Sequence, residues 1–104
     1  MKYDKLVRDK IPEIIESKGK KAICRTLDEA EYKEYLEKKL DEEVAEFHES
    51  KDIEELADIV EVLVALAAEC GYDFCDIYKK RCIKTAERGG FEKRICLIEV
   101  EEND

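Results

Sequence analysis

Residues that interrupt secondary structure are scarce in this chain of 104 residues, which contains one proline and four glycines. It has no tryptophan, and no apolar run approaches the roughly 18 residues that a membrane-spanning helix requires. The N-terminus lacks the apolar stretch of a secretory signal. These absences favour long helices with few breaks and predict no membrane association. We expect a single domain spanning residues 1–104, located in the cytoplasm.

Motifs for several common kinds of site are also missing. The five cysteines are an odd number without a Cys-x-x-Cys pair, which argues against a zinc ribbon or a disulfide framework. The single histidine, His48, has Ala45 three residues before it, so the Glu-x-x-His step of di-iron bundles is absent. Neither a glycine-rich phosphate loop nor an EF-hand loop is found. We therefore expect reduced, mostly buried thiols and a site built from other side chains.

Charge is abundant and unevenly distributed. The formal net charge of −9 makes duplex nucleic acid an unsuitable partner, because such binding depends on neutralising phosphates. Residues 28–61 carry 15 acidic and 4 basic side chains, whereas residues 1–25 and 79–94 are net basic. This pattern is consistent with a solvated acidic helix face that the chain ends offset. It is equally consistent with a cation site beside anion-binding segments.

Helix start and stop signals divide the chain into four expected helices. The expected segments are residues 11–16, 28–50, 52–70 and 73–88. The first has a proline near its first turn and stops near Gly19. Each of the other three begins at an aspartate followed three residues later by a second acid, the pattern of a capping box. These pairs are Asp28 with Glu31, Asp52 with Glu55, and Asp73 with Asp76.

Two short segments outside these helices have the character of strands. Residues 21–27 form an extended stretch, and residues 94–100 alternate well enough to pair with them. The turn between the second and third helices is short, which predicts that these two helices pack antiparallel. The expected fold class is therefore all-α: an antiparallel helical bundle with a short N-terminal helix and one small two-stranded β pairing.

Glutamates fall on a face of the second helix that should be covered. Helical periodicity places Leu36, Leu40 and Phe47 on one stripe, and Glu43 lies on the same stripe. Glu46, one turn later, lies at the edge of the stripe. A carboxylate on a core-facing stripe is costly to bury unless something pairs with it.

The third helix, expected to be central and buried because residues 59–68 are almost entirely apolar, repeats this arrangement. Glu55 and Asp58 share its apolar face, so an antiparallel hairpin would bring them opposite Glu43 and Glu46. Four converging carboxylates would repel one another, and Mg²⁺ or Mn²⁺ would relieve that repulsion. The alternatives are that lysines neutralise the acids, or that the helical phase differs by one residue.

The last helix carries basic residues along the face that begins with Phe74 and Ile77. These basic residues are Lys80, Arg81, Lys84 and Arg88. Their long stems would cover the edge of the core if the face is structural. If the face is functional, their charged heads would meet phosphate oxygens.

The acidic motifs resemble a known family. Residues 39–46 (KLDEEVAE) followed by residues 55–58 (ELAD) resemble the E-E-x-x-E…E-x-x-D signature of MazG-like, all-α nucleotide pyrophosphohydrolases. Residues 58–68, and 84–91 with their Lys-x-x-x-Arg-Gly-Gly-Phe pattern, fit the same family. Residues 5–12 resemble the start of a phosphoribosyl-ATP-pyrophosphohydrolase-like branch. The linker between the two acidic motifs is shorter than in many members, which leaves the base specificity open.

The resemblance implies Mg²⁺-dependent cleavage of a nucleoside triphosphate, or a related phosphoribosyl nucleotide, between the α and β phosphates. The implied metal ligands are Glu43, Glu46, Glu55 and Asp58, with Mn²⁺ a plausible substitute for Mg²⁺. The implied catalytic carboxylates are Glu42, Glu43 and Glu46, of which Glu42 would orient the attacking water. The implied phosphate-binding residues are Lys80, Lys84 and Arg88, together with Lys5 and Arg8 from the N-terminal segment.

The resemblance also implies a homodimer or a higher homo-oligomer, because the site in this family is often completed by a second subunit. Two other functions remain open on the sequence alone. One is a non-catalytic helical interaction or regulatory module, and the other is a nucleotide sensor that binds without hydrolysis.

Overall fold

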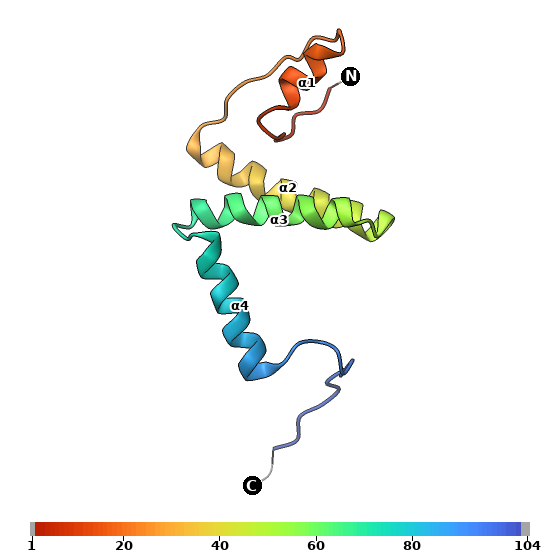
Figure 1. The fold of residues 1–104 in the computed structure, drawn as a ribbon, viewed down its shortest axis with the longest axis vertical. Coiled ribbons are helices and arrows are strands. Elements are labelled where there is room, and N and C mark those ends of the chain that lie inside the picture. Colours follow the sequence, from red (N-terminus) through yellow and green to blue (C-terminus); the bar gives the residue numbers. More distant parts are fainter. Residues whose placement is uncertain (1, 103–104) are drawn as a thin grey trace.

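Four helices make up all the regular secondary structure of residues 2–102, the part of the chain that the computed structural model describes (Figure 1). They are α1 (Ile11–Ser17), α2 (Glu29–Ser50), α3 (Ile53–Glu69) and α4 (Phe74–Arg88). Their boundaries follow the start and stop signals in the sequence, and the all-α expectation is confirmed. No helix within these residues is both long enough and apolar enough to cross a membrane.

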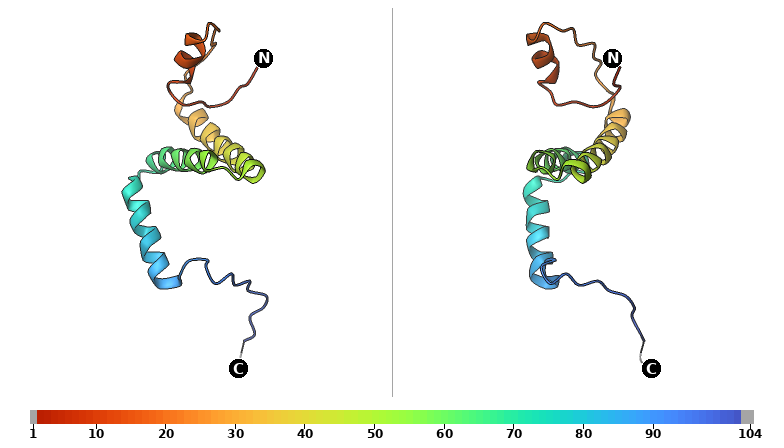
Figure 2. Two further views of the ribbon diagram at one scale, coloured as in Figure 1. Left: turned by 45° about the vertical axis from the view of Figure 1, so that its right-hand side comes forward. Right: turned by 90° about the vertical axis from the view of Figure 1, so that its right-hand side faces the viewer.

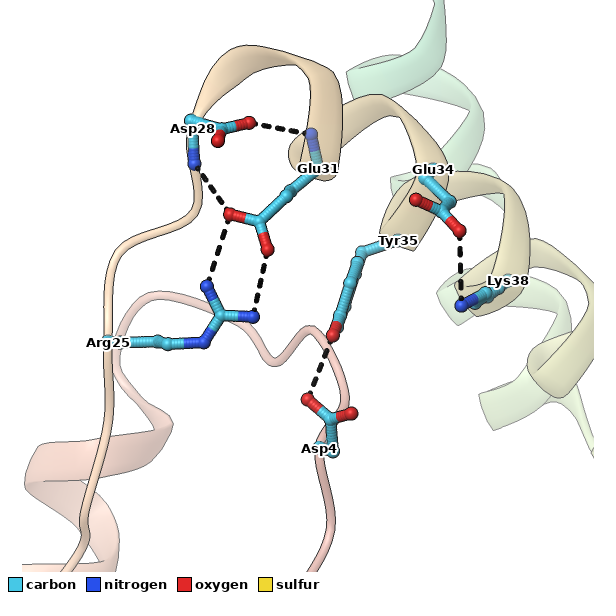
Figure 3. Close-up of polar contacts among 7 residues, drawn as sticks. All are labelled: Asp4, Arg25, Asp28, Glu31, Glu34, Tyr35 and Lys38. Atoms are coloured by element: carbon cyan, nitrogen blue, oxygen red, sulfur yellow. Dashed lines mark hydrogen bonds and ion pairs between the residues drawn. The ribbon is translucent and has the colours of Figure 1, made fainter.

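The start of α2 is fixed by the expected capping box (Figure 3). The Asp28 carboxylate accepts a hydrogen bond from the backbone N–H of Glu31 at 2.9 Å, and the Glu31 carboxylate accepts one from the Asp28 N–H at 3.4 Å. Arg25 donates to both Glu31 carboxylate oxygens, at 3.1 and 3.0 Å. Asp73 and Asp76 form the same box at the start of α4. These contacts satisfy backbone donors that have no partner within the helix.

The start of α3 differs from the expected capping box. Asp52 does cap this helix, but its carboxylate accepts from the N–H of Glu54 at 3.5 Å. The N–H of Asp52 donates to the Ser50 hydroxyl oxygen at 3.1 Å. The predicted pairing of Asp52 with Glu55 is therefore wrong, because Ser50 occupies the donor that a Glu55 side chain would have needed.

The helices α2 and α3 fold back on each other as the expected antiparallel hairpin (Figures 1 and 2). The buried apolar side chains of the described residues are Leu36 from α2 with Val62 and Ala67 from α3. One charged side chain, that of Glu43, is buried with them. The core of the single chain is therefore the face between these two helices.

The fourth helix does not lie along the hairpin. A glycine at positive φ, Gly71, ends α3, and the chain turns so that α4 runs away from the other helices (Figure 1). The molecule extends over 68 × 31 × 23 Å, and its radius of gyration is 18.9 Å. A compact chain of this length would have a radius of gyration of about 13 Å. The single chain thus consists of the α2–α3 hairpin and a projecting α4. The α4 helix does not pack along the hairpin to complete the expected bundle.

Several surfaces expected to be covered are open as a consequence. Val60, Leu63 and Val64 of α3 are exposed, so the prediction that α3 is buried on nearly all sides is wrong for the single chain. The five cysteines are all free and exposed, which corrects the expectation of mostly buried thiols. Residues 21–27 and 94–100 are irregular rather than paired, and they lie toward opposite ends of the molecule (Figure 1).

Candidate metal centre

Three glutamates of α2 come together near the middle of the hairpin, and we call them the acidic cluster: Glu42, Glu43 and Glu46. One carboxylate oxygen from each lies within 4.8 Å of the others. The spacing along one helix produces this grouping, because residues three or four positions apart lie on the same helical face. Carboxylate groups at such separations repel one another unless a cation lies near them.

The Glu43 carboxylate is the unusual member of the cluster, because only 5% of the residue is exposed. Its Oε1 atom forms an ion pair with Lys39 Nζ at 3.1 Å. Its Oε2 atom is buried and has no hydrogen-bond partner in the structure. A buried carboxylate oxygen without a partner is costly, and hydrogen-bonded pairing is the rule for such atoms. The burial of Glu43 on the apolar stripe was predicted from the helical periodicity and is confirmed.

Two lysines partly neutralise the cluster. Lys5 Nζ lies 3.1 Å from Glu42 Oε1, and Lys39 Nζ lies 3.5 Å from Glu42 Oε2. Partial burial acts to raise the pKa of Glu42, but the hydrogen bond from Lys5 and the charge of Lys39 outweigh it and lower the pKa. The same hydrogen bond raises the pKa of Lys5. Glu42 is therefore ionised at neutral pH.

Glu46 has the opposite electrostatic environment. Desolvation raises its pKa, and the negative charges of Glu43 and Glu42 raise it further. Within the described part of the chain, Glu46 forms no ion pair of its own. Three carboxylates thus face two ammonium groups, and the excess negative charge falls on the Glu43–Glu46 pair.

The raised pKa of Glu46 predicts a pH dependence of folding in the absence of metal. Because the folded protein binds this proton more tightly than the unfolded chain, stability is greatest below the ordinary glutamate pKa and falls as the pH rises through the raised value. In Glu46→Gln, this fall should be reduced. Urea unfolding of both proteins between pH 4 and 7, in the presence of a chelator, measures the difference.

The exposed Glu49, one turn further along α2, supplies the matched control. We expect Glu49→Gln to keep the pH profile of the original protein. A profile that Glu46→Gln leaves unchanged would contradict the assignment of the excess charge to Glu46.

The predicted ligands on α3 do not join the cluster in the single chain. Glu55 and Asp58 are half-buried on α3, and neither belongs to the group of close carboxylates found among residues 2–102. Asp58 Oδ1 instead forms an ion pair with Arg8 Nη2 at 2.7 Å. The structure therefore brings together Glu43 and Glu46 of the four predicted ligands, with the adjacent Glu42.

The N-terminal segment lies against these acids. Asp4 accepts a hydrogen bond from the Tyr35 hydroxyl at 2.8 Å (Figure 3), and Lys5 and Arg8 follow with their contacts to Glu42 and Asp58. The sequence predicted that Lys5 and Arg8 would be near a bound anion. In the structure both are near the acidic residues of the site, and each is paired with a carboxylate.

Lys39 is the site residue that the sequence analysis did not single out. It contacts both Glu42 and Glu43, at separations of three and four residues along α2. A lysine placed i, i+3 and i, i+4 from two glutamates is a recognisable signal for such pairs. It supports the alternative in which lysines neutralise the acids, although it leaves Glu43 Oε2 without a partner.

The predicted phosphate-binding residues of α4 lie apart from the cluster. Lys80, Lys84 and Arg88 are exposed, and they lie on the helix that runs away from the hairpin (Figure 1). Lys80 borders a shallow hollow with Tyr72 and Ile77. The single chain therefore does not bring the α4 cations to the acidic cluster.

No protein-family model matches the chain, and no solved structure matches it. A protein of Mycolicibacterium smegmatis described as uncharacterized is 56% identical over 41 residues, which is 39% of this chain and 42% of that protein. The chain thus matches less than half the length of this relative.

Proposed function

We propose that the protein is a Mg²⁺-dependent nucleotide pyrophosphohydrolase of the MazG-like kind, acting in the cytoplasm. Its reaction would cleave a nucleoside triphosphate, or a related phosphoribosyl nucleotide, to the monophosphate and pyrophosphate. The observation that carries this proposal is the buried Glu43 carboxylate, whose Oε2 atom has no partner and which lies beside Glu42 and Glu46.

The donor set of the acidic cluster fits a hard divalent cation. Mg²⁺ takes oxygen ligands and usually binds proteins through one or two carboxylates, with water and substrate phosphates completing its shell. Glu43 and Glu46 supply two such carboxylates with excess negative charge, and Mn²⁺ accepts the same ligands. In the proposal, Glu55 and Asp58 of α3 complete the protein ligands.

The residues around the cation would divide the chemical work. A bound Mg²⁺ polarises phosphoryl oxygens and lowers the pKa of a coordinated water. Glu42, which is ionised and held by Lys5 at 3.1 Å, would accept a hydrogen bond from the attacking water and orient it toward the α-phosphorus. The water oxygen would bond to the α-phosphorus and pass a proton to Glu42, while the bond from the α-phosphorus to the bridging oxygen breaks and pyrophosphate leaves with that oxygen.

Basic side chains would stabilise the charge on the phosphates. Lys5 and Arg8 already lie at the acidic residues, and a substrate phosphate would accept hydrogen bonds from the N–H groups that their carboxylate partners leave free. Lys84 and Arg88, with Lys80, would contribute from α4, and we propose that they do so in a homodimer or higher homo-oligomer. Arginine and lysine at such positions neutralise the charge that develops as the leaving group departs.

One observation favours a second candidate function. Lys5 and Lys39 neutralise part of the cluster, and both α3 and α4 expose large apolar side chains. A non-catalytic helical interaction module would have both properties without needing a metal. A nucleotide sensor without hydrolysis would share the cation site and lack turnover.

Pyrophosphate release separates these functions. The protein is assayed against a panel of ordinary and modified nucleoside triphosphates and phosphoribosyl-ATP, with Mg²⁺, with Mn²⁺ and with a chelator. We expect release that depends on the metal, and a melting temperature that rises when Mg²⁺ is added. Absence of turnover with every substrate, together with an unchanged melting temperature, would overturn the proposal. A metal-dependent rise in melting temperature without turnover would indicate the sensor.

A further inference from the structure

Two irregular segments, residues 21–27 and 94–100, have the composition of strands and no strand partner within residues 2–102. Neither residues 21–27 nor residues 95–100 form backbone–backbone hydrogen bonds in the structure. Their large apolar side chains are open to solvent, with Ile23, Ile95, Leu97, Ile98 and Val100 each between 72 and 90% exposed. Unpaired backbone groups and apolar side chains of this kind favour pairing with another strand.

The two segments are poorly placed to pair within one chain. They lie toward opposite ends of a molecule 68 Å long, separated by the hairpin and α4 (Figures 1 and 2). A strand pair requires backbones about 5 Å apart. A second copy carries the same two segments. The first segment of each copy can therefore pair with the second segment of the other, and all four segments then have a partner.

The exposed area of the chain is large enough for an extensive dimer. The accessible surface is 9699 Å². A compact monomer of this mass would expose about 6,000 Å². The excess, about 3,700 Å² per chain, exceeds what each partner contributes to most obligate dimers, whose interfaces bury about 2,000–5,000 Å² in total.

We propose that residues 21–27 of one copy pair antiparallel with residues 94–100 of a second copy. Two-fold symmetry then forms the pair twice, so that two exchanged β pairs hold a homodimer. This inference gives a location to the self-association proposed above, and it does not depend on hydrolysis of a nucleotide.

Charge complementarity sets the direction of the pairing. Lys20 and Lys21 stand at the start of the first segment, and Glu99 and Glu101 stand at the end of the second. An antiparallel pair brings these opposite charges together, which stabilises a sheet. A parallel pair would instead place Lys21 beside Arg94, and like charges opposite each other are destabilising.

The charges and the apolar side chains together set the register, because Lys21 opposite Glu101 would place Ile23 opposite Glu99. When Lys21 lies opposite Glu99, Ile23 lies opposite Leu97 and Cys24 lies opposite Cys96. Residues directly opposite in an antiparallel pair have Cα atoms about 4.5–5.5 Å apart. This separation falls within the range that a disulfide can bridge. Both thiols are free and exposed, so an added oxidant can report on the pairing.

Cross-linking between two different single-cysteine proteins tests the exchange directly. One full-length preparation retains only Cys24 and the other retains only Cys96, with serine at the other four cysteines and tags of different size. The two single-cysteine variants are co-expressed in one cell and purified together. The purified protein is then treated with diamide, which takes two electrons and two protons from each pair of thiols. We expect a heterodimer on a non-reducing gel that dithiothreitol removes, because neither chain can form this disulfide alone.

A preparation retaining only Cys70, mixed with the Cys96 preparation, is the matched control. Cys70 is also exposed but lies at the end of α3. Equal cross-linking of Cys70 and Cys24 to Cys96 would overturn the proposed register. A monomeric mass at about 100 μM, or a Cys24–Cys96 disulfide within one chain of the otherwise unmodified protein, would overturn the exchange.

Charge reversal provides a second test that needs no oxidation. Lys21→Glu or Glu99→Lys should each weaken self-association roughly tenfold, because each places like charges opposite one another at two positions in the dimer. The double variant should restore the association constant, as measured by sedimentation equilibrium. Lys93→Glu, which lies just outside the paired segment, should change the constant much less. Failure of the double variant to restore association would overturn the charge pairing.

Discussion

Replacing Glu43 by glutamine is expected to reduce Mg²⁺-dependent pyrophosphate release by at least about 100-fold, because the variant lacks a charged metal ligand. Glutamine has nearly the same shape, so the side chain should still fit between α2 and α3. The ion pair with Lys39 at 3.1 Å is lost, and the repulsion from Glu46 is removed with it. We therefore expect the free energy of unfolding without metal to be unchanged or higher.

Three measurements make this result interpretable. Turnover is measured at saturating Mg²⁺, Mn²⁺ binding is measured by titration, and unfolding in urea is measured in a chelator. The matched control is Glu49→Gln, an exposed position on the same helix that should leave all three unchanged. If Glu43→Gln instead unfolds the protein without metal, Glu43 is a structural partner of Lys39 and the cation site is not where we place it.

The helices and the central feature of the site could be predicted because their causes are local. Asp28 and Asp73 cap helices through partners three residues away, so the capping boxes can be recognised from the sequence. The burial of Glu43 follows from the 3.6-residue period that also places Leu36 on the stripe.

The errors arise where contacts within a few residues compete. At the start of α3, the sequence pattern paired Asp52 with Glu55, but the hydroxyl of Ser50 takes the Asp52 N–H at 3.1 Å. Serine and aspartate side chains both bond to nearby backbone groups. A motif that tests one residue pair at a time does not show whether Ser50 or Glu55 accepts the hydrogen bond from the Asp52 N–H.

Contacts between residues far apart in the sequence were even harder to predict. Arg8 and Asp58 are 50 residues apart and meet at 2.7 Å, and no periodicity encodes that meeting. The exposed faces of α3 pose a related problem, because an apolar pattern states that a surface should be covered without stating by which chain. The sequence thus predicted the surfaces to be covered, whereas the arrangement of α4 had to come from the structure.

Replacing Leu36 by alanine should have the largest effect on stability. Leu36 is 2% exposed and belongs to a core of three buried apolar residues within the described part of the chain. Truncating a buried leucine costs about 2–5 kcal/mol. That is a large fraction of the roughly 5–15 kcal/mol by which a typical domain is stable. Urea unfolding at fixed protein concentration measures the loss.

The exposed Ile53 at the start of α3 provides the control, because Ile53→Ala removes a side chain that is 75% exposed. Substitutions at such surface positions usually change the free energy of unfolding by less than about 0.5 kcal/mol. Equal losses for Leu36→Ala and Ile53→Ala would mean that the hairpin interface is not the main source of stability. If the interface is the main source, Leu36→Ala should lower activity only through the folded fraction and leave the Mg²⁺ dependence of the remaining molecules unchanged. Glu43→Gln should do the reverse, and this contrast separates the residues that maintain the hairpin from those that bind the cation.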